Sequence, residues 1–598
     1  MLGNTSLFLP VDLEVTATAD GGRILRSRYP LGEYPQVLTH DLARWADEAP
    51  DRTFLAERAG PNQWRRVSYG EALRYVRRLA GALLAAGLGP DRPLTMLSGN
   101  SVAQGVLTLA AIHVGIPVVP VSPAYSLMSR DYGKLKHIVT LATPGMFYVE
   151  EMAPFEAALA AVASDRPVMT AEDVWAQADE EGSVSSEVDK AHAQVGPDTV
   201  AKILFTSGST GNPKGVINTH RMLCSNQQSL VRSWPFIERR PPVLVDWLPW
   251  SHTFGGNHNF NMVLRNGGTL YIDGGKPTPG LIGMSVQNLR EVSPTVYFNV
   301  PAGFDALLPH LENDADFARA FFANLDLIFY AAAALPQKTW DRLRAVSERT
   351  LGRVVPMTSG WGATETAPLA TSSYFPVDMS GNIGVPVPGV EIKLALVNDK
   401  WEVRVRGPNV TPGYLKNPEA TAAAFDEDGF YRTGDAVELC DPSTPAAGLM
   451  FGGRISENFK LSSGTWVNVG AVRTHFVNAL SPLLLDVVIA GENRDELGVL
   501  AFPNLPACRQ ALGVDEKADV CADPRLHALI QQKAAPYNQQ YPAGSTRITR
   551  LLLQRQPPDI DAGETTDKSY LNQRTILRRR ASEVESLFAG GPDVIFLK

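Results

Sequence analysis

Hydrophobic residues recur along this chain with two different periods, and the longer period predicts its clearest helix. Between residues 68 and 87 apolar side chains return every three or four positions, at Leu73, Val76, Leu79, Leu83 and Leu84. This spacing is typical of one face of an amphipathic helix. Ser68 and Glu71 have the spacing of a capping box and Gly87 is a stop signal, so we expect the helix to lie between them.

Short apolar runs predict buried strands. Leu94–Leu97 and Pro117–Val121 flank a helical stretch from Val102 to His113, which gives the order strand, helix, strand. Such units build parallel sheets that are covered by helices. We therefore expect the large amino-terminal part to be α/β with stacked layers, and a helical bundle is the less favoured alternative. Further runs of the same kind are Ile203–Phe205, Val243–Trp247, Thr295–Phe298 and Leu325–Tyr330.

The hydrophobic pattern changes after residue 390. Glu391–Leu394 and Trp401–Val405 alternate polar and apolar residues, which predicts a hairpin-rich, barrel-like β subdomain. A loop of residues 441–448 with two prolines and a glycine then leads to Leu449–Arg454, a suitable place for a hinge.

The expected hinge near Arg454 divides the chain into two domains. The first is a large, multi-layered domain of residues 1–453 with α/β subdomains and the β-rich subdomain. The second is a small α+β domain of residues 454–598. Within the second, the run Arg578–Arg580 lies in a helical pattern and is expected to form a solvated face.

The composition of the 598 residues limits the classes of protein that fit. A content of 44% hydrophobic and 20% charged residues is typical of soluble globular proteins, and the net charge of -8 argues against nucleic-acid binding through the overall field. No apolar run reaches the ~18 residues of a membrane span, and the first residues lack the pattern of a signal peptide. The four cysteines form no CxxC pair, which favours a reduced compartment. We therefore expect a cytoplasmic protein with no nucleic-acid partner and no membrane partner.

The segment Thr206–Gly215, with the sequence TSGSTGNPKG, is the most informative part of the chain. It follows an apolar, strand-like run, and its glycines, hydroxyl groups and single lysine suit the oxygens of a triphosphate. It differs from a Walker A loop because Pro213 stands five positions after Gly208, and because Lys214 is followed by glycine. We therefore predict a phosphate loop of a different class, rather than a flexible surface turn.

This loop resembles the signature of the adenylate-forming superfamily, which includes acyl-CoA synthetases, firefly-type luciferases and the adenylation domains of non-ribosomal peptide synthetases. Gly360–Glu365, Tyr431–Asp435 and Gly453–Arg454 resemble further segments of that family, and they stand in the same order. The order makes the resemblance specific, because each short segment alone would be weak. The resemblance implies activation of a carboxylic acid by ATP, transfer of the acyl group to coenzyme A, and a small domain that is mobile and entered at Arg454.

The residue types suit that chemistry, because attack of a carboxylate on ATP joins two anions and needs compensating positive charge. By resemblance Thr364 would contact the α-phosphate, Glu365 would hold Mg²⁺, a cation that prefers oxygen ligands, and Asp435 would accept hydrogen bonds from the ribose hydroxyls. Lys568 matches the family's adenylation lysine, which bridges the substrate carboxylate and the α-phosphate. The resemblance assigns the β- and γ-phosphates to Thr206, Ser207, Gly208, Ser209, Thr210 and Lys214.

The resemblance also implies the sites of the acid, the adenine and coenzyme A. Trp247–Gly255 resembles the segment that lines the acyl pocket, with His252 as a gate; the alternative is a buried histidine that bonds only within the core. Gly464 would leave room for pantetheine. The pocket for the acid would be lined by Trp250, His252, Phe254, Asn259, Asn299 and Tyr330. The adenine slot would comprise Ala331, Ala332, Ala333, Ser359, Gly360, Trp361 and Gly362.

The chain departs from the family pattern near the predicted hinge. Ser456 stands where the family generally has Asp or Lys, and Gly470 and Ala471 replace a usual acidic residue. These variants and the segment Asp567–Arg574 resemble the feruloyl-CoA synthase branch, so ferulate and related aromatic acids are the leading substrates. The alternatives are another aryl or fatty acyl-CoA synthetase, a domain that loads a carrier protein, and a catalytically silent nucleotide-binding module. A homodimer is compatible with the sequence, which does not determine the oligomeric state.

Overall fold

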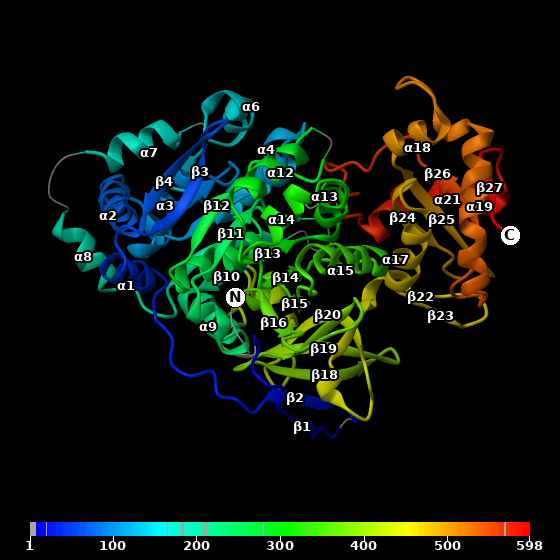
Figure 1. Ribbon diagram of the computed structural model, residues 1–598, viewed down its shortest axis with the longest axis horizontal. Helices are drawn as coiled ribbons and strands as arrows, with labels where there is room; N and C mark the ends of the chain where they lie inside the picture. Colours follow the sequence, from blue (N-terminus) through cyan, green and yellow to red (C-terminus); the bar gives the residue numbers. More distant parts are fainter. Residues whose placement is uncertain are drawn as a thin grey trace.

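The computed structural model describes residues 7–19, 21–163, 165–180, 185–206, 212–278, 280–333, 335–566 and 570–598. Within these ranges the chain forms a larger amino-terminal lobe and a smaller carboxy-terminal lobe, which is orange and red at the right of Figure 1. Strands and helices are mixed in both lobes, so the expected α/β class is confirmed. None of the helices in these ranges is both long enough and apolar enough to span a membrane.

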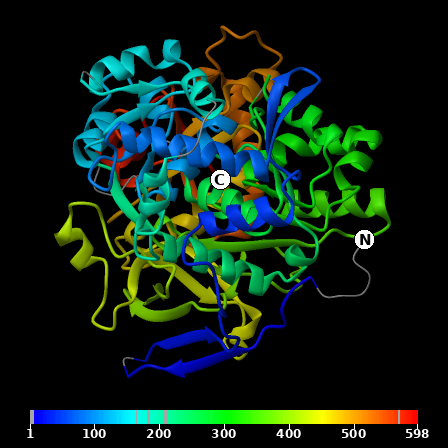
Figure 2. The same ribbon diagram turned by 90° about the vertical axis from the view of Figure 1, so that its left-hand side faces the viewer.

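The largest sheet of the described residues joins segments that are far apart in the sequence. Its strands are, in spatial order, β1 (Leu13–Ala17), β2 (Arg23–Ser27), β18 (Glu391–Val397), β19 (Lys400–Arg406), β20 (Tyr431–Leu439), β21 (Leu449–Arg454), β17 (Asn382–Pro386), β16 (Leu369–Ser372), β15 (Met357–Gly362), β14 (Leu327–Tyr330) and β13 (Val296–Asn299). The β1–β2 hairpin lies along β18, and Figures 1 and 2 show it as the blue pair beside the yellow-green strands.

The β18–β19 hairpin was expected from the alternating pattern and is confirmed. It continues the same sheet as β13–β16 and does not form a separate sheet. The expected hinge segment Leu449–Arg454 is strand β21, which pairs with β20 and β17 and so belongs to this sheet.

Strands β13, β14 and β15 are parallel neighbours, and this arrangement positions the candidate site. Phe298 stands opposite Phe329, and Tyr330 stands opposite Ser359. Because the carboxyl ends of parallel strands meet at one edge of a sheet, the segments after these strands lie together. That edge carries most of the residues assigned to the adenine slot.

Two further sheets complete the larger lobe. One has the order β10 (Lys214–Thr219), β9 (Val200–Thr206), β6 (Val118–Pro120), β5 (Leu94–Met96), β7 (Met146–Tyr148) and β8 (Val168–Met169). The other has the order β11 (Val243–Asp246), β12 (Thr269–Ile272), β3 (Thr53–Gly60) and β4 (Gln63–Ser68). The expected strand, helix, strand unit is confirmed as β5, α3 (Val102–His113) and β6. Helix α3 is apolar and buried on every side, so it packs inside the lobe.

The expected amphipathic helix is α2 (Tyr69–Ala85), and its cap forms as predicted. The Glu71 backbone N–H donates to Ser68 Oγ at 3.3 Å, and the Ser68 N–H donates to the Glu71 carboxylate at 2.8 Å. This reciprocal pair satisfies N–H groups that the first turn of a helix leaves free.

The other helices of the larger lobe cover its sheets. They are α1 (Thr39–Glu48), α4 (Ala124–Leu127), α5 (Gly133–Ala142), α6 (Met152–Val162), α7 (Ala171–Ala178), α8 (Ser186–His192), α9 (His220–Ser233), α10 (Phe236–Arg239), α11 (Phe260–Arg265), α12 (Ile282–Glu291), α13 (Pro301–Asn313), α14 (Ala315–Phe322), α15 (Gln337–Leu351) and α16 (Pro418–Ala423). A π-helical turn, Phe254–Asn259, leads directly into α11. Such turns are frequently found at functional sites.

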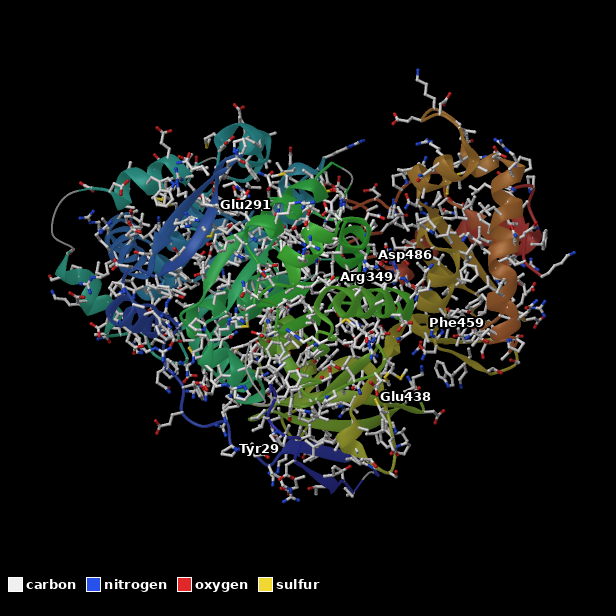
Figure 3. The ribbon with its side chains drawn as sticks, in the orientation of Figure 1. Tyr29, Glu291, Arg349, Glu438, Phe459 and Asp486 are labelled. Atoms are coloured by element: carbon white, nitrogen blue, oxygen red, sulfur yellow. The ribbon has the colours of Figure 1, made fainter. Side chains whose placement is uncertain are left out.

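The smaller lobe packs around cores of its own, which begin at Phe459. Figure 3 labels Phe459 and Asp486 in this lobe. Its sheet has the order β24 (Leu484–Ala490), β25 (Leu497–Pro503), β26 (Ile548–Leu553) and β27 (Val594–Phe596), and a short hairpin joins β22 (Phe459–Lys460) to β23 (Trp466–Val467). Its helices are α17 (Val469–Leu480), α18 (Leu505–Leu512), α19 (Pro524–Gln540), α20 (Gln573–Arg579) and α21 (Ala581–Ala589). The boundary between residues 453 and 454 stays a prediction.

The expectation of a solvated face at Arg578–Arg580 is wrong for its last residue. Arg580 lies between α20 and α21 and is 8% exposed. Its guanidinium pairs with the buried carboxylate of Glu564 at 2.6 Å. A local helical pattern does not reveal this partner, which is 16 residues earlier in the chain.

Candidate active site

The predicted phosphate loop connects two antiparallel strands. Thr206, at the end of β9, stands opposite Lys214, at the start of β10. Pro213 accepts a hydrogen bond at its carbonyl oxygen from His137 Nε2 of α5, at 3.0 Å. Ser207, Gly208, Ser209 and Thr210 lie outside the described residues, so their predicted contacts stay predictions.

Tyr414 brings Lys214 next to the predicted metal ligand. The Lys214 ammonium lies 5.1 Å from the centre of the Tyr414 ring, and the Tyr414 hydroxyl donates to Glu365 Oε1 at 3.0 Å. Glu365 is 9% exposed. The burial of Tyr414 and the negative charge of Glu365 together raise the pKa of Tyr414 above its usual value. The hydroxyl therefore stays protonated and donates. The sequence analysis did not single out Tyr414, although the turn-forming Pro412 and Gly413 precede it.

The segment with Thr364 and Glu365 is fixed by buried amides beneath it. Asn409 Nδ2 donates to the Thr366 carbonyl at 2.8 Å, and Asn226 Nδ2 donates to the Leu369 carbonyl at 2.7 Å. Thr364 itself is buried. Gly362 packs so closely that a Cβ atom there would lie 1.8 Å from the carbonyl oxygen of Pro368, so only glycine fits. The backbone between β15 and β16 is therefore held before any ligand binds.

Asp435 is buried between a hydrogen-bond donor and a cation. Trp361 Nε1 donates to Asp435 Oδ2 at 3.0 Å, and Arg454 Nε forms an ion pair with Asp435 Oδ1 at 3.0 Å. Burial raises the pKa of Asp435, whereas the charge of Arg454 and the hydrogen bond from Trp361 lower it, and burial has the larger effect. The predicted ribose ligand, the predicted adenine-slot aromatic residue and the predicted hinge arginine therefore form one contact group.

The remaining adenine-slot residues lie at the carboxyl edge of β14 and β15, as their positions in the sequence predict. Ala331, Ala332 and Ala333 follow Tyr330 directly, and Ala332 has a φ of 74°, which is rare for a residue other than glycine. This turn places the Ala332 carbonyl oxygen 3.3 Å from the hydroxyl of Tyr570, which donates to it from the smaller lobe. Residues from both lobes therefore meet at this edge. Ser359, Gly360, Trp361 and Gly362 form the neighbouring part of β15.

The predicted acyl-pocket segment runs through the π-helical turn. Trp250 is buried, and its ring centre lies 4.8 Å from that of Phe260. Phe254 contacts Phe329 of β14 with ring centres 5.9 Å apart. His252 is half-buried and precedes this turn, and its backbone carbonyl accepts from the Gly256 N–H at 2.8 Å.

The two asparagines assigned to the acid already bond within the protein. Asn259 Nδ2 donates to Asp246 Oδ2 at 2.8 Å. Asn299 Nδ2 donates to the Tyr297 hydroxyl at 2.9 Å, and Asn299 Oδ1 accepts from Trp247 Nε1 at 3.2 Å. A phenolic oxygen would have to replace one of these bonds, so their assignment to the substrate stays a prediction.

The residues assigned to the smaller lobe are less connected to this edge. Gly464, with a φ of 81°, lies in the turn between β22 and β23, and its N–H donates to the Leu461 carbonyl at 2.9 Å. Lys568 lies outside the described residues. Its described neighbours Thr566 and Tyr570 are joined by a hydrogen bond from the Thr566 N–H to the Tyr570 carbonyl, at 2.9 Å. The contact from Tyr570 to Ala332 therefore lies two residues from the predicted adenylation lysine.

Comparison with known proteins identifies an enzyme family and related ligases. The sequence profile described as "AMP-binding enzyme" matches residues 42–415. Among curated proteins, the chain is 27% identical over 430 residues to a 3-[(3aS,4S,7aS)-7a-methyl-1,5-dioxo-octahydro-1H-inden-4-yl]propanoyl:CoA ligase of Rhodococcus jostii, which covers 68% of this chain and 78% of that protein. It is 25% identical over 475 residues to a 4-coumarate–CoA ligase of Pinus taeda, which covers 76% of this chain and 80% of that protein.

A solved structure shows the same fold. The ATP-bound MatB of Rhodopseudomonas palustris superposes with a TM-score of 0.65, covers 92% of this chain and 99% of its own, and is 22% identical. The similarity therefore extends over both lobes.

Proposed function

Because the chain belongs to the AMP-binding enzyme family, we propose that it is an ATP-dependent ligase that activates a carboxylic acid as its acyl adenylate and transfers the acyl group to coenzyme A. One observation carries the proposal: Tyr414 joins Lys214 to Glu365, beside the edge where Trp361 holds Asp435. These residues come from widely separated segments, yet each has a contact that fixes it. A catalytically silent nucleotide-binding module would not need the full set.

In the first step a carboxylate oxygen bonds to the α-phosphorus of ATP, and the bond to the bridging oxygen of pyrophosphate breaks. Lys214 offsets the charge of the β- and γ-phosphates, and Asp435 orients the ribose by accepting from its hydroxyls. Lys568 would bring the carboxylate and the α-phosphate together. The products are the acyl adenylate and pyrophosphate.

Glu365 fits the role of a magnesium ligand. It is a buried carboxylate, with one oxygen held by Tyr414. Among the described residues no group of three or more His, Cys, Asp and Glu side chains could hold a metal ion. Mg²⁺ is commonly bound through one or two carboxylates together with substrate phosphates and water, so the single carboxylate is sufficient. When bound, the cation would neutralise phosphate charge.

In the second step the thiol sulfur of coenzyme A bonds to the acyl carbon of the adenylate, and AMP leaves with the bonding electrons. The thiol proton passes to solvent. This step needs no cysteine of the protein, and burial raises the pKa values of Cys224, Cys508 and Cys521, which disfavours their thiolates.

An aromatic acid is the proposed substrate class, with ferulate, coumarate and caffeate as the first candidates. Two observations support it. The resemblance of the hinge and carboxyl-terminal segments is to the feruloyl-CoA synthase branch, and a 4-coumarate–CoA ligase is among the relatives. The aromatic side chains Phe254, Phe298 and Phe329 contact one another beside the π-helical turn, and such a cluster suits a planar ring.

The test is a panel of aromatic and aliphatic acids supplied with ATP, Mg²⁺ and coenzyme A, with pyrophosphate, AMP and thioester as readouts. We expect release of both phosphorus products with the hydroxycinnamates. Lys568→Ala should abolish adenylate formation and spare thioester formation from a supplied acyl adenylate. Lys517→Ala, at an exposed position of the smaller lobe, should leave both half-reactions unchanged. Absence of adenylate and thioester with every acid, in a protein that still binds ATP, would favour the binding-module alternative.

A further inference from the structure

A segment of the smaller lobe crosses to the larger lobe. Residues 554–566, which we call the strap, follow β26, and part of the red chain reaches across in Figure 1. Ile560 is 9% exposed and packs in an apolar cluster of the larger lobe. Its carbonyl oxygen accepts from Lys134 Nζ at 2.8 Å, and Asp561 Oδ2 accepts from the Arg130 backbone N–H at 2.9 Å. The strap is therefore bound to the larger lobe by an apolar contact and two hydrogen bonds.

The strap is also fixed to its own lobe by Arg580. The guanidinium donates to both carboxylate oxygens of Glu564, at 3.1 and 2.6 Å, and to Gln554 Oε1 at 2.8 Å. It also donates to the carbonyl oxygens of Gln556 and Pro557, each at 3.1 Å. A planar guanidinium with this many partners holds a loop in one shape. Displacement of Ile560 or Asp561 is therefore transmitted along the strap.

The far end of the strap leads to the residues beside Lys568. Thr565 pairs with Leu571 as an isolated antiparallel bridge, and the Thr566 N–H donates to Tyr570. Tyr570 in turn donates to Ala332 in the predicted adenine slot. The chain before and after the predicted adenylation lysine is therefore anchored to the larger lobe, at Ile560 and Asp561 on one side and at Tyr570 on the other.

Helix α5 holds the strap and the phosphate loop with one face. Lys134 and His137 are three positions apart, so their side chains lie on the same side of the helix. Lys134 contacts Ile560, and His137 contacts the Pro213 carbonyl, next to Lys214. The helix therefore fixes the distance between the strap and the loop that binds the triphosphate.

We propose that α5 is a clamp between the lobes, and that Lys134 and Asp561 are positioning residues for adenylate formation. They touch neither ATP nor the acid. They hold the strap, which leads to the segment with Lys568, beside α5, whose His137 contacts the Pro213 carbonyl next to Lys214. This inference rests on the proposed function. It assigns the clamp to the first half-reaction alone, because a supplied acyl adenylate bypasses the step that needs Lys214 and Lys568.

The first test separates the half-reactions. Lys134→Met removes the ammonium but keeps a long apolar side chain. Lys136→Met is the matched control, because Lys136 is exposed and its ammonium donates to the Asp131 carbonyl just before the same helix. We expect Lys134→Met to lower kcat of acid-dependent ATP–pyrophosphate exchange about tenfold, with little change in KM for ATP. A loss of this size corresponds to one hydrogen bond to a charged group. Thioester formation from supplied adenylate should be unchanged. An equal loss in both half-reactions, or no loss in either, would overturn the proposal.

The second test reads the contact without catalysis. Asp561→Ala removes the acceptor for the Arg130 N–H, so we expect faster hydrogen exchange of that amide by mass spectrometry. Asp561→Asn keeps an oxygen acceptor, so it should restore both the protection of the Arg130 amide and the activity in ATP–pyrophosphate exchange. If Asp561→Ala leaves the Arg130 amide as protected as in the wild type, the clamp is absent. If the wild-type protein has no ligase activity but Asp561→Ala still loses protection of the Arg130 amide, the result counts against the proposed function and not against the clamp.

Discussion

Replacing Trp361 by phenylalanine tests whether the buried carboxylate of Asp435 holds the nucleotide. The substitution keeps an aromatic face for the adenine, and it removes the indole N–H that donates to Asp435 Oδ2 at 3.0 Å together with part of the ring system. Asp435 is 6% exposed, so water does not readily replace the lost donor. A hydrogen bond to a charged group contributes about 1.5–3 kcal/mol, and a loss of about 2 kcal/mol corresponds to roughly 30-fold weaker binding.

The assay is ATP affinity by calorimetry, together with KM for ATP in pyrophosphate exchange. Trp340→Phe is the matched control, because Trp340 is also buried (1% exposed, against 9% for Trp361) and its indole N–H has no hydrogen-bond partner among the described residues. Both variants lose similar packing, but only Trp361→Phe loses a bond to a carboxylate. ATP affinity within twofold of the wild type for Trp361→Phe, or an equal loss for Trp340→Phe, would refute the reasoning.

The same substitution has a pH signature. Asp435 must be ionised to accept from both ribose hydroxyls, and burial already raises its pKa. ATP therefore binds with full affinity above the pKa of Asp435, and the affinity falls as the pH is lowered through this pKa. Trp361 lowers the pKa of Asp435, so its loss should move the acid limb of the affinity profile to higher pH. A limb at unchanged pH would show that another group controls it.

Two further predictions concern stability. Lys202 is buried, its ammonium donates to neutral oxygen atoms, and burial lowers its pKa to about 7. Because the unfolded chain binds this proton up to a higher pH, the unfolding free energy of the wild type should rise by about 2 kcal/mol between pH 7 and 9. Lys202→Met should abolish that rise in urea titrations. Equal pH dependence in both proteins would contradict this. Arg580→Met removes the closer of two cations that pair with the buried Glu564, the other being Arg579 at 3.7 Å, so the smaller lobe should lose about 3 kcal/mol of unfolding free energy in thermal unfolding. Arg578→Met, at an exposed position, should change little. Similar midpoints for the two variants would exclude a stabilising role for the buried pair.

The elements that depend on local patterns were predictable from the sequence. The cap of α2 and the unit β5, α3 and β6 were predicted because periodicity and capping act over a few residues. The parallel pairing of β13, β14 and β15 follows from the same rule, since strands in such units pair with their neighbours. The lesson is that short-range order in the sequence was sufficient for the layers.

Long-range contacts were not predictable in this way. The pairing of β2 with β18 joins residues almost 370 positions apart, for example Leu25 with Ile392, and no local signal in either strand names its partner. Tyr414 and Arg580 were missed for the same reason, because their partners Glu365 and Glu564 come from other segments. The sequence supplied the residue types of the candidate site, and the tertiary contacts decide which side chains face one another.

One departure from the family pattern near the hinge, Gly470, has a steric reason in this fold. A Cβ atom on Gly470 would lie 3.1 Å from the Cα atom of Gly453, so the start of α17 packs backbone to backbone against the end of β21. An acidic side chain at position 470 would not fit without separating them. Arg454 follows Gly453 directly and pairs with Asp435. The charge of Arg454 offsets part of the cost of burying the Asp435 carboxylate, so a movement of the chain at Gly453 would change the charge balance at the predicted ribose site. We therefore expect nucleotide binding and the orientation of the smaller lobe to be coupled through this ion pair.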